Sequence, residues 1–130
     1  MQTEQSALIL FAHGSRDARW AEPFDRLRKA VQAQLPAQPV RLAFLELMAP
    51  NLHDAVAELV RAGCVRISVV PVFLGQGGHV RRDLPRMVDD LCEVYPGIVL
   101  QVAEAVGEND LVLQAMVRYC VSCADDRQVP

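Results

Sequence analysis

The sequence has no excess of positive charge. Its 130 residues include 13 lysines and arginines against 16 aspartates and glutamates, for a formal net charge of −3 at pH 7. Proteins that hold a nucleic acid or an anionic membrane through a global field carry a basic surplus. The balance therefore argues against both partners, and we expect any anionic ligand to be held locally by a few side chains.

Long hydrophobic runs are also missing. The first apolar run, residues 7–12, spans six residues and follows a segment that contains no basic residue. A secretory signal requires a basic segment and a longer apolar core, and a membrane-spanning helix requires about 20 apolar residues. We expect neither in this chain.

Cysteines are few and scattered. Cys64, Cys92, Cys120 and Cys123 lie in a chain long enough to fold without disulfides. We therefore expect reduced thiols and a cytoplasmic location. Cys120 and Cys123 have the C-x-x-C spacing of metal and redox sites, but the chain holds no second pair, so the motif is weak evidence for either chemistry.

Linkers and nucleotide-binding motifs are absent as well. The glycine-rich "GQGGH" lacks the G-x-G-x-x-G frame that follows a first strand, and no G-x-x-x-x-G-K-[ST] occurs.

A hydrophobic fraction of 52% is sufficient for the core of one domain. We predict a single domain over residues 1–130, in which residues 121–130 form a flexible tail.

Four short apolar runs, rich in β-branched and aliphatic residues, recur at residues 7–12, 40–46, 65–73 and 98–105. Each is followed by a stretch whose apolar residues have helical spacing, such as Leu52, Val56 and Leu59. Runs that are almost wholly apolar are typical of parallel strands buried between helices. The sequence predicts an α/β fold: a small open parallel four-stranded sheet with helices on both faces.

In such sheets, ligands bind outside the carboxyl ends of the strands. The distinctive polar residues after the first three runs are His13, Glu46 and His79, at equal steps of 33 residues. Two imidazoles and a carboxylate can bind a divalent transition metal, and imidazoles can accept protons near neutral pH. Taken singly, each residue could instead be a loop histidine or a solvated carboxylate. Their coincidence at one edge favours a shared site.

Glycines and arginines flank these candidates. Glycine allows backbone N–H groups to approach a flat or anionic ligand closely, and arginine pairs with carboxylates through a two-pronged fork. The arginines could equally be surface charges. The flanking residues are Gly14, Arg16, Gly75, Gly77, Gly78, Arg81 and Arg82.

Together these segments resemble the class II chelatases that act on sirohydrochlorin, in their short single-domain form (CbiX/SirB type). The matching pieces are "LILFAHGSR", "FLELMAPNLHDAV" and "VRISVVPVFLGQGGHVRRDLP". The third is the most specific, because it joins "VVPVFL", a glycine-rich turn, a histidine and "DLP" in that order. The resemblance implies half of the two-domain class II chelatase fold, and therefore a homodimer.

The resemblance also implies an activity and site roles. The activity is insertion of cobalt(II), iron(II) or nickel(II) into sirohydrochlorin, on routes to cobalamin, siroheme or nickel tetrapyrroles, with the metal as substrate and no organic cofactor. His13 and His79 match the metal-binding histidines, and His13 the proton acceptor. Leu74, Gly75, Gln76, Gly77 and Gly78 match the segment that lines the tetrapyrrole, and Ser15, in the matching "LILFAHGSR", is a further candidate for substrate binding.

Two departures leave the metal open. Ala49 stands where some short relatives have glutamate, and Gln76 where they have a third-loop histidine. The alternative function is a non-catalytic metal or tetrapyrrole carrier that uses the same crevice. A histidine phosphatase is disfavoured, because Ala12 rather than arginine precedes His13.

Overall fold

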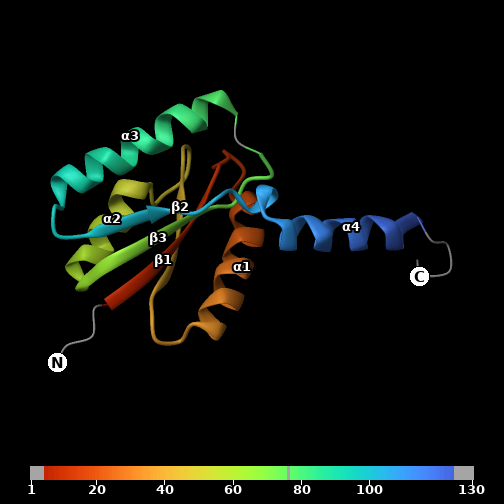
Figure 1. Cartoon of the computed structure of the whole chain (residues 1–130), viewed down its shortest axis with the longest axis horizontal. Helices are drawn as coiled ribbons and strands as arrows, with labels where there is room; N and C mark the ends of the chain where they lie inside the picture. Colours follow the sequence, from red (N-terminus) through yellow and green to blue (C-terminus); the bar gives the residue numbers. More distant parts are fainter. Residues whose placement is uncertain (1–4, 76, 125–130) are drawn as a thin grey trace.

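The structure, a computed structural model, describes residues 5–75 and 77–124, apart from the side chain of His79. Strands and helices alternate along this part of the chain, as predicted (Figure 1). The strands are β1 (Gln5–Ala12), β2 (Val40–Phe44), β3 (Cys64–Pro71) and β4 (Val99–Val102). The helices are α1 (Ala21–Gln34), α2 (Leu52–Arg61), α3 (Gly78–Val94) and α4 (Asp110–Ala124), with short 3₁₀ helices η1 (Ala18–Trp20) and η2 (Val106–Glu108).

The four strands form one parallel sheet in the order β2-β1-β3-β4, which confirms the predicted fold class. Three strands end earlier than the apolar runs suggested, and β3 ends at Pro71. β2 ends at Phe44, and Leu47, with a left-handed φ of 67°, turns the chain. β4 ends at Val102, and the chain then turns into η2.

Helices cover both faces of the sheet. α1 packs against β1 and β2 on one face, whereas α2 and α3 pack on the other (Figure 1). The chain leaves β1 toward β2 on one side and leaves β3 toward β4 on the other. The loops after β1 and β3 therefore diverge at the carboxyl edge, which is the arrangement that opens a ligand crevice in α/β sheets.

The main core lies between the sheet and the α2–α3 layer. Ile9 and Phe11 of β1 and Val69 of β3 are fully buried there, as are Leu59 of α2 and Leu91 of α3. Burial of side chains of this size contributes about 1.5–3 kcal/mol each. This packing holds the carboxyl ends of β1 and β3 in fixed positions.

α4 does not join this core. It projects from the body, contacts η2 and has no buried residue (Figure 1). Because α4 does not fold back over the sheet, the face of β3 that bears Arg66, Ser68 and Val70 is only partly covered, so the prediction that β3 is buried on both faces holds for one face alone.

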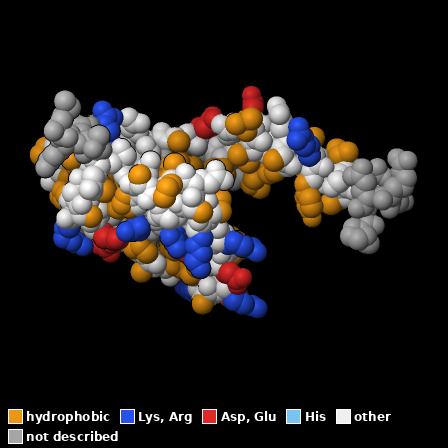
Figure 2. All heavy atoms as spheres, turned by 90° about the horizontal axis from the view of Figure 1, so that it is seen from below, with side chains coloured by type: hydrophobic (Ala, Val, Ile, Leu, Met, Phe, Trp, Pro, Cys, Tyr) orange, Lys and Arg blue, Asp and Glu red, His pale blue; other side chains and the backbone are white. Residues whose placement is uncertain are grey.

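The C-terminal helix also changes the predicted tail. α4 continues to Ala124, so residues 121–124 are helical, while residues 125–130 lie outside the described part. Hydrophobic side chains are visible along the projecting arm in Figure 2. The large exposed hydrophobic residues of the helix are Leu111, Leu113, Val117, Tyr119 and Val121. Even so, within residues 5–75 and 77–124 no helix has both the length and the apolar character needed to cross a membrane.

Candidate functional site

The ends of β1 and β2 place two of the predicted site residues side by side. His13 directly follows β1, and Glu46 lies two residues beyond β2. The Leu45 N–H donates a hydrogen bond to the Ala12 carbonyl oxygen at 2.8 Å, which extends the pairing of the two strands by one step. This backbone contact brings Glu46 to His13.

The two side chains contact each other at the edge of the sheet. His13 Nδ1 lies 3.4 Å from Glu46 Oε1, while Glu46 Oε2 accepts the Gly14 N–H at 3.2 Å. Both side chains are about half exposed, at 46% and 45%. A carboxylate at Nδ1 holds the imidazole in one orientation and leaves Nε2 as the nitrogen for a metal ion or a proton.

Gly14 makes this close approach sterically feasible. A Cβ at this position would collide with the backbone carbonyl oxygen of Glu46 and would lie 3.3 Å from the Met48 side chain. Only glycine therefore fits between the loop after β1 and the loop after β2. Gly14, predicted from the sequence to bind ligand, thus also has a packing role in the structure.

Aromatic residues hold His13 from behind. The imidazole lies against the Phe73 ring, with centroids 4.6 Å apart and an interplanar angle of 42°. Phe73 is buried and contacts Phe11 edge-on at 6.0 Å. The Trp20 indole N–H donates to the His13 carbonyl oxygen at 2.7 Å. The ring and the backbone of His13 are thus both held in place. The sequence did not predict that Phe73 and Trp20 would contact His13.

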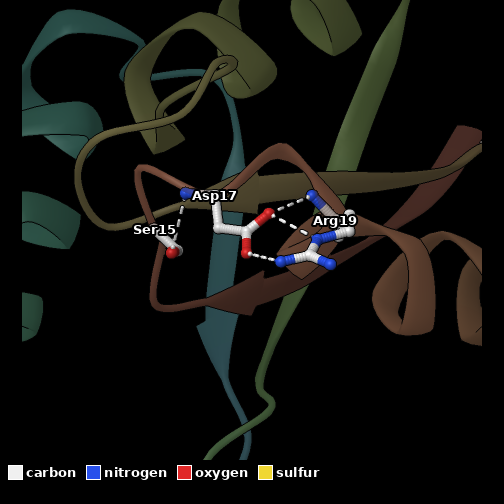
Figure 3. A network of polar contacts seen from close by, with 3 residues as sticks. All are labelled: Ser15, Asp17 and Arg19. Atoms are coloured by element: carbon white, nitrogen blue, oxygen red, sulfur yellow. Dashed lines mark hydrogen bonds and ion pairs between the residues drawn. The ribbon is translucent and has the colours of Figure 1, made fainter.

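A polar network shapes the loop after His13 (Figure 3). The Asp17 N–H donates to Ser15 Oγ at 3.1 Å, and the Asp17 carboxylate accepts hydrogen bonds from Arg19 Nε at 3.1 Å and from its terminal nitrogen at 2.8 Å. The Arg19 side chain lowers the pKa of Asp17 below its usual value. Ser15 therefore supports the loop, and Arg16, between Ser15 and Asp17 in the sequence, is exposed.

The loop between β3 and α3 is braced by η2. The Gly107 N–H donates to the Phe73 carbonyl oxygen at 2.9 Å, and a Cβ on Gly107 would collide with the backbone of Leu74. The Leu74 side chain projects outward and is 72% exposed. Leu74 directly follows Phe73, the residue that supports the His13 ring.

The glycines of this loop are not explained by the fold of the chain alone. A Cβ at Gly75, Gly77 or Gly78 would meet nothing within 4 Å, and none of the three has a left-handed φ. Gln76 lies outside the described residues. His79 lies in the first turn of α3, but its side chain is also outside the described part, so its convergence with His13 and Glu46 stays a prediction. Among the described residues, no three histidine, cysteine or acidic side chains form a metal cluster.

A cleft of about 430 Å³ opens beside the His13–Glu46 pair. Its volume lies within the range of small-molecule sites. The lining residues come from the ends of β1 and β2 and from one side of α3: His13, Leu45, Glu46, Asp83, Arg86, Met87 and Asp90.

The α3 lining was not predicted from the sequence, which suggested the arginines next to His79 instead. Arg81 lines a different cleft of about 300 Å³ beside Val102, and Arg82 is exposed on α3. The signal that was available is the spacing of Asp83, Arg86 and Asp90, since residues three and four positions apart share one face of a helix.

Comparison with known proteins identifies the family. The CbiX family model matches residues 7–121. The sirohydrochlorin cobaltochelatase of Methanopyrus kandleri is 34% identical over 82 residues, which cover 63% of this chain and 57% of that protein. The sirohydrochlorin ferrochelatase of Bacillus subtilis is 23% identical over 112 residues, which cover 86% of this chain and 43% of that protein. The chain thus spans about half the length of these two relatives.

A solved structure agrees with this assignment. The crystal structure of a CbiX protein from Marinobacter aquaeolei VT8 matches with a TM-score of 0.81 and 34% identity, over 94% of this chain and 98% of that one. The family model covers all the strands and helices except the first two residues of β1 and the last three residues of α4. The chain belongs to the CbiX family.

Proposed function

We propose that this chain inserts a divalent metal ion into sirohydrochlorin. The observation that supports this most directly is a histidine oriented by a carboxylate, at the mouth of an open cleft, in a member of the CbiX family. Two relatives are named sirohydrochlorin cobaltochelatase and sirohydrochlorin ferrochelatase. Cobalt(II) is the first metal to test, followed by iron(II) and nickel(II).

In the proposed reaction, His13 and His79 bind the incoming metal ion, which is a substrate. Neutral imidazole is a good ligand for such ions, and the contact between His13 Nδ1 and Glu46 directs Nε2 to that role. Glu46 is a third candidate ligand. The role of His79 rests on its sequence position, at the start of α3.

Insertion must also remove two protons from the pyrrole nitrogens. As these nitrogens replace the protein's ligands, an imidazole is released and can accept a proton. We assign one of the two protons to His13, whose Nδ1 lies 3.4 Å from the Glu46 carboxylate, and the other to solvent water. One residue can therefore deliver the metal and take up a proton.

The proposed seat of the macrocycle is the loop between β3 and α3. The exposed Leu74 side chain offers an apolar contact, and the open space over the loop glycines allows a flat ring to approach the backbone. The ring carries carboxylates on its rim, for which nearby cations are candidate partners. The proposed substrate-binding residues are Gly14, Ser15, Arg16, Leu74, Gly75, Gln76, Gly77, Gly78, Arg81 and Arg82.

We also propose that the chain works as a homodimer, in the cytoplasm. The projecting α4 exposes Leu113, Val117 and other apolar side chains that its own chain does not cover. An apolar cleft of about 300 Å³ between α3 and β4, lined in part by Leu84 and Val102, is a candidate seat for α4 of a second copy. Burial of these side chains would stabilise the assembly.

The proposed cytoplasmic location rests on the scattered, unpaired cysteines.

The test is a metal-insertion assay with purified protein. Sirohydrochlorin is mixed with cobalt(II), iron(II) or nickel(II), and the visible spectrum follows formation of the metallated ring. An enzyme accelerates insertion when present in substoichiometric amounts. A carrier, which binds metal or ring without turnover, shows at most one ring metallated per site.

A further inference from the structure

The cleft beside His13 contains one basic side chain among acidic ones. Its polar lining consists of His13, three carboxylates from Glu46, Asp83 and Asp90, and the guanidinium of Arg86. A ligand that enters this cleft with a negative group therefore finds one favourable partner there. The other polar groups in the lining are three carboxylates and the His13 imidazole, and none of them carries a permanent positive charge.

Arg86 lies at the middle of the acidic face of α3. Asp83 precedes it by three residues and Asp90 follows it by four, so all three side chains share the face that lines the cleft. Arg86 is exposed, and the described part of the chain gives it no hydrogen bond or ion pair. By contrast, Arg19, Arg28 and Arg41 are each paired with a carboxylate.

We propose that Arg86 binds one rim carboxylate of the tetrapyrrole and so fixes which edge of the ring lies against α3. This inference rests on the proposed function. A guanidinium fork recognises a carboxylate through two parallel hydrogen bonds, which set direction as well as distance. Asp90, which follows Arg86 by four residues on the same face, repels a second carboxylate, so a ring rotated in its plane toward Asp90 is disfavoured.

The experiment measures steady-state insertion by Arg86→Gln, Arg86→Lys and the control Arg26→Gln. Arg26 is an exposed arginine on α1 and lines neither cleft. Each variant is assayed with sirohydrochlorin varied at saturating cobalt(II), and then with cobalt(II) varied at saturating sirohydrochlorin. Fluorescence titration with the metal-free ring measures binding separately from turnover, and thermal unfolding checks that the variants are folded.

For Arg86→Gln we expect the KM and Kd for sirohydrochlorin to rise about 10- to 100-fold, the range for loss of a charge-assisted hydrogen bond. The KM for cobalt(II) and kcat should stay within about threefold. Arg86→Lys should recover part of the loss, because it keeps the charge without the fork. Arg26→Gln should behave as wild type.

The inference is overturned if Arg86→Gln binds sirohydrochlorin as tightly as wild type, or if it lowers kcat while KM is unchanged. Either result with an active wild-type protein leaves the proposed function intact. If the wild-type protein itself inserts no metal yet Arg86→Gln weakens ring binding, the proposed function fails and the carboxylate contact stands.

Discussion

Glu46 joins His13 to the backbone of the same loop through a single carboxylate. Its Oε1 lies 3.4 Å from His13 Nδ1, and its Oε2 accepts the Gly14 N–H at 3.2 Å. The two contacts tie the end of β1 to the end of β2. A change at Glu46 should therefore alter the orientation of His13 before it alters the fold.

Glu46→Gln tests this relationship. The amide has nearly the same shape but no charge to orient and stabilise the His13 imidazole. We expect the rate of cobalt(II) insertion to fall about 10- to 100-fold, the usual cost of losing a carboxylate that orients a metal-binding histidine. Initial rates from the visible spectrum measure the loss.

The matched control is Glu22→Gln, which removes an exposed carboxylate from α1. For both variants we expect a free energy of unfolding within about 0.5 kcal/mol of the wild-type value, because Glu46 is about half exposed and Glu22 is exposed. An unchanged rate for Glu46→Gln would show that the carboxylate has no part in the reaction.

Gly14→Ala and Gly75→Ala should behave differently. A Cβ at Gly14 collides with the Glu46 backbone, so we expect a loss of about 1–3 kcal/mol in the free energy of unfolding. A Cβ at Gly75 meets nothing within 4 Å, so stability should stay within about 0.5 kcal/mol of wild type. If the ring occupies that space, the KM of Gly75→Ala for sirohydrochlorin should rise roughly fivefold or more.

Urea unfolding and insertion kinetics on the same preparations separate these effects. A Gly75→Ala variant with wild-type stability and a wild-type KM for sirohydrochlorin would show that the ring does not lie against Gly75 in the β3–α3 loop. A Gly14→Ala variant as stable as wild type would mean that the two loops do not pack as described.

Arg19→Gln should change the titration of Asp17. The Arg19 side chain holds the pKa of Asp17 below its ordinary value of 3.8, so the variant's Asp17 pKa should move back toward that value. Because the folded-state pKa is lowered, the pair stabilises the loop above about pH 4 and loses this effect as the pH falls through the folded-state pKa. Carboxyl NMR shifts against pH measure the change; an identical Asp17 titration in both proteins is the contrary result.

Leu113→Glu combined with Val117→Glu should prevent dimer formation. The two residues are four apart on α4, so they share a face, and they are 49% and 52% exposed in the single chain. We expect sedimentation to show a dimer for wild type and for the control Arg118→Gln, and a folded monomer for the double variant. A monomeric wild-type protein, or a double variant that stays dimeric, rules out this role for α4.

The sheet was predictable from the sequence because its strands are continuous apolar runs. β1 and β3 have the composition of buried parallel strands, and glycine at position 63, with a φ of 94°, marks the end of α2. The convergence of His13 and Glu46 also followed from the sequence, because carboxyl ends of parallel strands share an edge.

Other features depend on tertiary packing that no short pattern specifies. In the sequence, Phe73 is simply the last apolar residue of the run 65–73, yet in the structure its ring supports the His13 ring. The projection of α4 could not be foreseen, because a helix with apolar residues on several sides usually folds against its own sheet. Arg86 was passed over because the cleft it lines forms only when α3 packs beside the ends of β1 and β2.

The number of rings that each protein chain metallates tests directly whether the chain is a metal-inserting enzyme. Sirohydrochlorin and cobalt(II) are supplied in large excess over wild-type protein and over His13→Ala, with a no-protein reaction to measure spontaneous insertion. We predict many turnovers per wild-type chain and a rate for His13→Ala close to the spontaneous one. No acceleration by the wild-type protein, or at most one metallated ring per chain, would contradict catalysed insertion. Full activity in His13→Ala would contradict the role of His13.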